Sequence, residues 1–173
     1  YKELMIRLID RYKTNASSYL KDSVNRGLAE VDTLFPELTV AKNKKGFRPT
    51  DHQAYQWFRV LNRSLFNSRL PMVPLHIRKL HKDWGRCVVN WDNRKTPKGT
   101  FDQRVIPYHI ECDYFIELHC KFPKWKDFIE TLAHEMVHLY QMTWLKDPYS
   151  NHNKNFFAWR TKFARAGLNL ARC

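Results

Sequence analysis

The sequence predicts an α+β fold, and three observations lead to this prediction. Two long segments, residues 50–67 and 125–145, carry apolar side chains at helical spacing. Three shorter runs between them, residues 73–80, 84–91 and 104–112, are rich in β-branched and aromatic residues, as strands are. No internal repeat is present. At 173 residues and 43% hydrophobic content, the chain is long enough for one domain with a proper core, plus an appendage.

Residues 1–40 are predicted to form an N-terminal helical extension. Two apolar stripes support this prediction, and they consist of Leu4, Met5, Leu8, Ile9 and Tyr12, then Leu28, Val31, Leu34 and Phe35. Pro36 stops the pattern, and residues 36–49 are polar, basic and turn-like. We therefore expect a boundary here, followed by a second domain over residues 50–173.

The second domain is predicted to begin with a helix. Thr50 has the character of an N-cap, Asp51 suits the first turn, and the helical pattern closes near Asn67. The strand-like runs come next, and Pro107 places the third of them at an edge or a bulge. Residues 113–120 fit either a short helix or another strand.

Residues 125–145 are predicted to form a helix with two different sides. Its apolar residues gather on one side, and they are Trp125, Phe128, Ile129, Leu132, Met136, Leu139 and Tyr140. His134 and His138 lie away from that side, near Asp127 and Thr131. We expect the apolar side to anchor the helix in the core while the histidines face a cleft.

His134, Glu135 and His138 form the pattern H-E-x-x-H on this helix. Residues four apart lie on one face of a helix, so the two imidazoles can aim at a single point. Glu135 projects from the same turn, close enough to act on a water molecule held at that point. This is the arrangement of a zinc hydrolase, with His134 and His138 as metal ligands and Glu135 as the general base.

A catalytic zinc needs a third protein ligand, and the sequence narrows the choice. Gln141 and Trp144 stand where the metzincin pattern requires Gly and His, which excludes that class. No Glu follows Glu135, so the usual gluzincin ligand is also missing. The third ligand is therefore predicted to be His152, with Asp147 as the second choice and a residue from upstream as the remaining alternative.

The net charge of +13, from 30 Lys and Arg against 17 Asp and Glu, favours a polyanionic partner, most commonly nucleic acid. Phe47, Trp84 and Trp91 lie among basic residues, as a surface that stacks bases would require, although each also fits a core position. The basic, loop-like stretches contain Lys42, Lys44, Lys45 and Arg48, then Arg78, Lys79, Lys82 and Arg86, then Arg94, Lys95 and Lys98. We expect DNA to bind through these loops.

The four cysteines include no C-x-x-C pair, which excludes a zinc ribbon or a thioredoxin-type site within this sequence. Reduced thiols in a cytosol-like compartment are the simplest interpretation. No apolar run approaches the length of about 18 residues that a membrane span requires, so no membrane partner is expected. The expected location is the cytoplasm, in association with the nucleoid, or the nucleus; a viral protein would be expected in the virion.

The segment LAHEMVHLYQ, followed after a loop by NHNKNFFAW, resembles the SprT-like metalloprotease family. That family includes bacterial SprT proteins and the Spartan-type proteases of eukaryotes. Its third His is followed about four residues later by Phe, which Phe156 matches. Residues 65–71 and 84–86 are similar to two further family segments, so the resemblance covers about residues 50–168.

The resemblance implies zinc on His134, His138 and His152, with Glu135 as the catalytic base. It also implies a compact zincin-like fold with a small sheet packed on the H-E-x-x-H helix, and cleavage of peptide bonds as the activity. Many SprT proteins carry a Cys-rich zinc ribbon after this core, and the present sequence has none. Either the ribbon was lost or the chain is shortened, so a DNA role is expected to depend on the basic loops or on partners.

We therefore predict that the protein is a zinc-dependent endopeptidase. It is expected to associate with DNA and to act on DNA-bound or crosslinked proteins, as in DNA repair. The first alternative is a nucleic-acid-associated structural or assembly protein, for example of a virus, that retains the zinc site. The second is a non-proteolytic zinc hydrolase, such as an amidase or a DNA-processing enzyme.

Two supporting roles remain open in the sequence. An oxyanion needs a hydrogen-bond donor, and Tyr140 and Tyr149 are the candidates nearest in sequence, although both also fit structural roles. Asp127 or Asp147 could accept a hydrogen bond from a ligand imidazole and so orient it.

Overall fold

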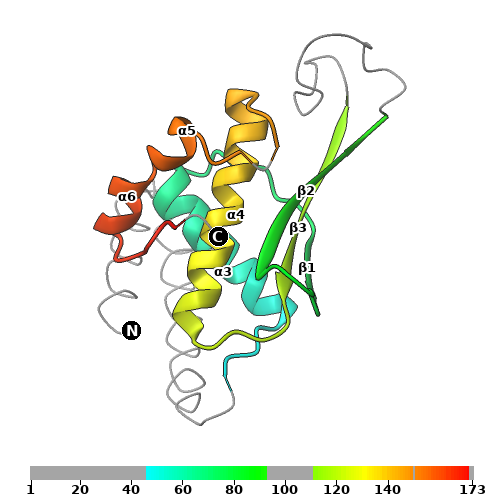
Figure 1. Ribbon diagram of the computed structural model, residues 1–173, viewed down its shortest axis with the longest axis vertical. Coiled ribbons are helices and arrows are strands. Elements are labelled where there is room, and N and C mark those ends of the chain that lie inside the picture. Colours follow the sequence, from blue (N-terminus) through cyan, green and yellow to red (C-terminus); the bar gives the residue numbers. More distant parts are fainter. Residues whose placement is uncertain (1–45, 93–110, 150, 172–173) are drawn as a thin grey trace, which may run out of the picture.

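The computed structural model describes residues 46–92, 111–149 and 151–171, and it has the predicted α+β architecture (Figure 1). Its elements are α3 (Asp51–Phe66), β1 (Leu75–Arg78), β2 (Gly85–Trp91), β3 (Cys112–His119), α4 (Trp125–Tyr140), η3 (Gln141–Leu145), α5 (Lys154–Phe157) and α6 (Arg160–Arg165). The predicted extension over residues 1–40 lies outside the described residues, as do residues 104–110 of the third predicted strand.

Helix α3 begins and ends where the sequence predicts. The Thr50 hydroxyl accepts a hydrogen bond from the backbone N–H of Gln53, and the Gln53 side chain accepts one from the N–H of Thr50. This capping box satisfies two backbone donors that a helix start leaves unpaired. Asn67 ends the helix in the left-handed conformation, with φ of 53°. Its buried face includes Trp57, which packs edge-on against Trp125 of α4.

The sheet has three strands in the order β1-β3-β2, with β1 parallel and β2 antiparallel to β3. Of residues 113–120, all but the last therefore belong to a strand rather than a helix. Ile116 and Leu118 are fully buried on the face toward the helices. Side chains alternate between the faces of a strand, so Glu117 belongs to the outer face. Strand β2 is an edge strand within the described sheet.

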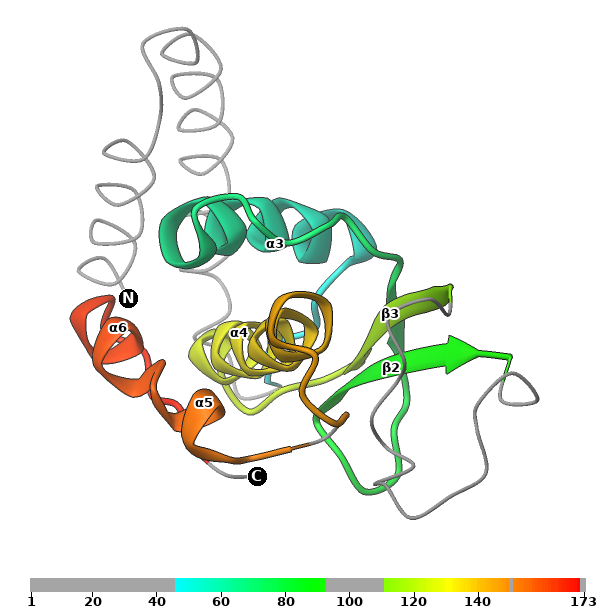
Figure 2. The ribbon, with the colours of Figure 1, turned by 90° about the horizontal axis from the view of Figure 1, so that it is seen from above.

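Helix α4 lies between the sheet on one side and α5 and α6 on the other, with α3 packed along it (Figures 1 and 2). The predicted apolar side of α4 is buried as expected, and its core residues include Phe128, Ile129, Leu132, Met136 and Leu139. The last part of the predicted helix, residues 141–145, is a π-helical turn. Among the described residues, no helix combines the length and apolar character needed to cross a membrane.

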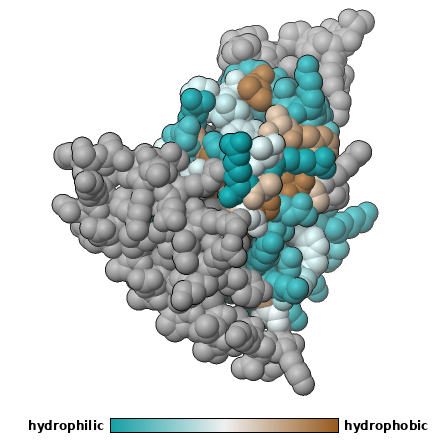
Figure 3. All heavy atoms as spheres, turned by 90° about the vertical axis from the view of Figure 1, so that its left-hand side faces the viewer, coloured by the Kyte–Doolittle hydropathy of each residue, from teal (hydrophilic) through white to brown (hydrophobic). Residues whose placement is uncertain are grey.

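Residues 154–168, whose sequence predicts a single last helix, instead form two short helices, α5 and α6. Ala158 and Trp159 interrupt it, and the Trp159 ring packs 4.5 Å from Phe66 and 5.0 Å from Tyr140. The chain then continues along α4 to Ala171, with Leu168 and Leu170 buried in the core. On the side of the molecule shown in Figure 3, hydrophilic residues predominate among those coloured, with a few hydrophobic ones between them.

Candidate metal centre

Three imidazoles meet at one point beside α4. His134 and His138 come from successive turns of α4, and His152 comes from the loop before α5. Their Nε2 atoms lie 3.2 Å apart for His134 and His138, 3.2 Å for His138 and His152, and 3.1 Å for His134 and His152. These three residues are a group that could hold a metal ion.

The spacing of these nitrogens fits a tetrahedral zinc ion. Zinc binds imidazole nitrogen at about 2.0–2.1 Å, and tetrahedral angles then place two ligand nitrogens roughly 3.3 Å apart. The observed separations of 3.1–3.2 Å are close to this value. Three ring nitrogens that converge in this way can all bind one cation placed between them. The residues present therefore fit the metal that the sequence predicts.

Phe156 forms an apolar support beneath all three histidines. Its ring centroid lies 4.8 Å from that of His134, 4.9 Å from that of His138 and 4.6 Å from that of His152. Phe156 is fully buried, and it lies in the short helix α5. The Asn153 side chain caps α5 by accepting from the backbone N–H groups of Asn155 and Phe156. This cap fixes Phe156 and the preceding His152 relative to each other.

Gln141 determines which nitrogen of His138 is free to bind a metal. The Gln141 Nε2 amide lies among three acceptors, at 2.9 Å from the Asn151 carbonyl and 3.1 Å from Asp147 Oδ2 and from Asn153 Oδ1. The amide oxygen must then face His138, whose Nδ1 lies 2.9 Å away. Nδ1 consequently donates, and Nε2 carries the lone pair. The same amide joins the π-helical turn to the loop that carries His152.

Burial keeps the two helix histidines neutral. The pKa of His134 is lowered to about 3, mainly by burial and also by repulsion from the imidazoles of His138 and His152. A hydrogen bond to the Ala171 backbone has a smaller, opposite effect. Burial and His152 likewise lower the pKa of His138 to about 4, although its hydrogen bond to Gln141 acts in the other direction. Neutral imidazoles are the form that binds metals, so both are available at neutral pH.

Glu135 is buried beside strand β2. Burial raises its pKa to about 8, and a smaller raising effect comes from Asp83, while a hydrogen bond from the Cys87 backbone opposes the rise. Gly85, at the start of β2, allows this approach: a Cβ there would lie 2.7 Å from Thr131 Cγ2 and 3.2 Å from Glu135 Cγ. The close contact between β2 and α4 therefore positions the carboxyl group.

A family model described as the SprT-like family matches residues 54–173. The chain belongs to the SprT-like family. This is a family of zincin-like metalloproteases, and it agrees with the resemblance that the sequence motifs indicate. Comparisons with curated proteins and with solved structures find no match.

Within this SprT-like domain, the remaining candidate residues have varied positions. Tyr140 packs against Phe66, Trp159 and Trp144, on the side of α4 away from the histidines, which is a structural position. Tyr149 packs 6.1 Å from Trp91 at the end of β2. The two carboxylates predicted to support the site, Asp127 and Asp147, form different hydrogen bonds, and none of these bonds is to a histidine.

Asp127 accepts from the backbone N–H of Lys124 and so helps to begin α4. Asp147 accepts from the side chains of Gln141, Asn153 and Asn155, and it thereby orders the loop that carries His152. Sequence reasoning did not assign a role to Gln141 or to Ala171. The only sequence signal for Gln141 is its place three residues after His138, within reach on a helix.

The basic stretches are described only in part. Lys42, Lys44, Lys45, Arg94, Lys95 and Lys98 lie outside the described residues. Arg78 and Arg86 are not in loops: they lie on β1 and β2, where both form ion pairs with the fully buried Glu117. Of the three aromatic residues considered for base stacking, Phe47 is buried in the core and Trp91 packs on Tyr149, while Trp84 is exposed.

Proposed function

We propose that this protein is a zinc-dependent endopeptidase that works on proteins associated with DNA. The observation that carries the proposal is the convergence of three imidazole Nε2 atoms at 3.1–3.2 Å, with Glu135 in the helical turn between two of them. A site that only stabilised the fold would not need a buried carboxyl group between its ligands. His134, His138 and His152 would hold the metal, in agreement with membership of a metalloprotease family.

Zinc bound at this site would supply a Lewis acid that polarises the scissile carbonyl and makes water more acidic. Glu135 acts as the general base: its carboxylate takes a proton from the attacking water and then gives it to the nitrogen of the leaving amine. In the metal-free protein burial raises the pKa of Glu135 to about 8; a zinc cation beside it would lower this pKa and favour the carboxylate that the first transfer needs. The Cys87 backbone orients the carboxyl group, and Phe156 excludes water from behind the imidazoles.

The association with DNA rests on charge. The net charge of the chain is +13, and the outer face of the sheet presents Arg78 and Arg86, whose side chains are 55% and 50% exposed. Both arginines are paired with Glu117, but a guanidinium group has five N–H donors, so their exposed sides are suited to contact the phosphates of a nucleic-acid strand.

The test combines metal analysis with proteolysis. Purified protein is expected to contain one zinc per chain and to cut a denatured basic protein, more rapidly with DNA and not at all with a chelator. Glu135→Gln should keep the zinc and lose about 10³-fold or more of the cleavage rate, because the base is removed while the ligands remain.

Retention of cleavage by Glu135→Gln would exclude this mechanism. Binding to DNA without any peptide fragments would favour a structural or assembly protein. Hydrolysis of amides other than peptides, with no proteolysis, would favour a different zinc hydrolase.

A further inference from the structure

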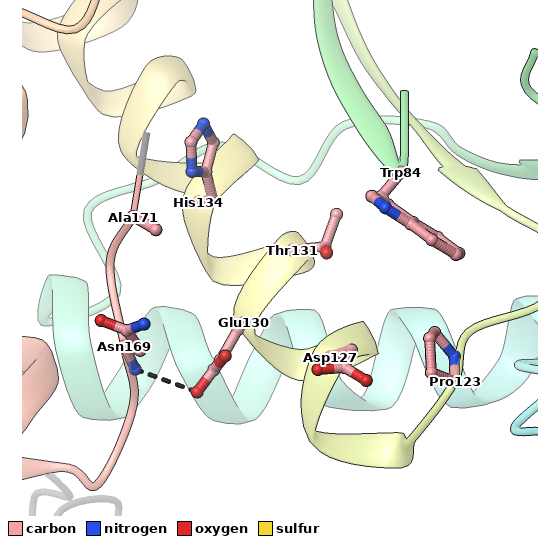
Figure 4. Close-up of a pocket in the computed structure, with 8 residues that line it drawn as sticks. All are labelled: Trp84, Pro123, Asp127, Glu130, Thr131, His134, Asn169 and Ala171. Carbon is pink, nitrogen blue, oxygen red and sulfur yellow. Dashed lines mark hydrogen bonds between the residues drawn. The ribbon is translucent and has the colours of Figure 1, made fainter. Parts of the chain in front are cut away.

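A hollow of about 260 Å³ opens directly beside His134 (Figure 4). One wall is the face of α4 that carries Asp127, Glu130 and Thr131, one to two turns before the histidine. Trp84 lies across from this face, and Asn169 with Ala171 forms the wall on the other side. Because pockets for drug-sized ligands begin at roughly 300 Å³, this space suits a single side chain.

Two carboxylates in the hollow are held in place and still have capacity to bind. Asp127 Oδ2 accepts from the backbone N–H of Lys124 at 3.0 Å, and Glu130 Oε1 accepts from the N–H of Asn169 at 3.0 Å. Lys126 lies 3.5 Å from the same Glu130 oxygen. Each carboxylate therefore uses one oxygen for the fold. The other oxygens, Oδ1 of Asp127 and Oε2 of Glu130, have no partner among the described residues.

The charge of the hollow is opposite to that of the chain as a whole. The described residues that line it include Asp127 and Glu130 but neither Lys nor Arg, in a chain with a net charge of +13. The half-exposed Trp84 ring adds an aromatic face, which attracts cations. Thr131, Pro123 and Ala171 contribute apolar surface between the charged groups. A side chain with a long apolar stem and a cationic end matches these walls.

We propose that this hollow is a subsite that binds a Lys or Arg side chain of the polypeptide substrate. The proposal rests on the proposed function in that His134, at the edge of the hollow, belongs to the centre where the peptide bond would be cut. Proteins that bind DNA carry many basic residues because they neutralise phosphates. A cation-selecting subsite would therefore direct the protease to the segments of a substrate that contact DNA.

Binding can be measured apart from catalysis in the Glu135→Gln background. Fluorescence anisotropy would compare three dye-labelled peptides that are identical except for one position, which is Lys, norleucine or Glu. We expect the Lys peptide to bind about tenfold more tightly than the norleucine peptide, and the Glu peptide to bind most weakly. The preference for Lys should shrink at high salt because the contacts are partly exposed.

Asp127→Asn with Glu130→Gln is the decisive variant, since amide oxygens can still accept from Lys124 and Asn169 while the charges are gone. It should bind the Lys and norleucine peptides equally. Asp113→Asn is the matched control: it removes a charge from an exposed position on β3, and it should keep the preference. Equal binding of the Lys and norleucine peptides in the Glu135→Gln background, or a preference that survives the double substitution, would overturn the proposal.

Cleavage maps separate this proposal from the protease itself. Fragments of a denatured protein cut by the unaltered enzyme should show Lys or Arg enriched at one fixed position relative to the cut. Cleavage without such enrichment would support the proposed endopeptidase activity and contradict the proposed subsite. A preference for the Lys peptide in binding, without any cleavage, would support the proposed subsite and contradict the proposed endopeptidase activity.

Discussion

The histidine cluster beside α4 and the Glu117 cluster on the outer face of the sheet are both polar and partly buried. They differ in whether the protein supplies partners of opposite charge. Glu117 is fully buried, and it has cationic partners on each neighbouring strand, Arg78 on β1 and Arg86 on β2. The protein itself therefore completes this cluster. The three histidines bring only nitrogen atoms to their common point, at 3.1–3.2 Å.

This difference indicates how a binding site can be told from a structural ion pair. A buried charge with partners on both sides contributes to the fold and needs nothing further. Three imidazoles whose Nε2 atoms converge at this spacing have the arrangement that a cation from outside the chain would complete. Other groups of the protein already hold the imidazoles for that cation, since Gln141 orients His138 and Phe156 supports all three.

The largest expected effect is the loss of a ligand. His152→Ala should lower zinc affinity by a factor on the order of 10³, because one of three protein–metal bonds is removed. Competition with a coloured chelator would measure this. His52→Ala, at an exposed position on α3, removes the same kind of side chain and should leave the affinity unchanged. A similar affinity in both variants would contradict the assignment of His152.

The second effect concerns the orientation of a ligand. Gln141→Leu should lower zinc affinity 10- to 100-fold, because the hydrogen bond that fixes the His138 ring is lost. Gln141→Glu keeps an acceptor for His138 but loses the amide donors to Asp147 and Asn153. If the two substitutions weaken binding equally, the connection to the loop matters more than the ring orientation.

The third effect tests the other cluster. Arg78→Ala with Arg86→Ala should lower the free energy of unfolding by about 2 kcal/mol, because Glu117 remains buried without a cation. This loss is smaller than that expected for a fully buried ion pair, because the arginines are half exposed. Adding Glu117→Gln should recover part of this loss. Denaturant unfolding would measure stability, and zinc affinity should stay constant. A large change in zinc affinity would show that the two clusters are coupled.

The smallest effect is a dependence of stability on pH in the presence of a chelator. The pKa values of His134 and His138 are lowered in the folded protein. Below about pH 6.5 the unfolded chain therefore takes up protons that the folded protein does not, and the free energy of unfolding falls as the pH falls. The pKa of Glu135 is raised, so the folded state keeps a proton that the unfolded chain has lost, and stability falls as the pH rises from about 4.5 to 8.

Stability should therefore be greatest near pH 6.5, where the effect of the histidines has ended and that of Glu135 continues. Thermal unfolding followed by circular dichroism would give the profile. Glu135→Gln should remove the decline between pH 6.5 and 8 while it leaves the acidic side in place. An unchanged decline in this variant would mean that another group is responsible.

The parts that the sequence could predict are those with local causes. Thr50 and Gln53 cap α3 through atoms three residues apart, and the side of α4 that carries His134 and His138 follows from helical spacing. The parts it could not predict depend on contacts between distant residues. Residues 113–120 have no decisive local pattern, and their pairing with both β1 and β2 makes them a strand.

The candidate site divides in the same way. The three histidines and Glu135 could be proposed from motif spacing and from the few donors that follow Glu135. The hydrogen bond from His134 to the Ala171 backbone joins residues far apart in the chain, so only the folded structure reveals it. No local pattern predicts that Glu117 is buried, because a carboxylate in a strand usually lies at the surface and its two arginine partners come from other strands.

The π-helical turn Gln141–Leu145 makes the metal centre sensitive to the length of the chain as well as to its composition. Each residue advances a helix by about 100°, and a π-helical turn holds one residue more than an α-helical turn. Deleting one residue after Gln141 would change no ligand, yet it would swing the following loop around the axis of α4 and carry His152 away from its partners. In a lineage of related sequences, insertions and deletions should therefore accumulate in other connections and avoid this one.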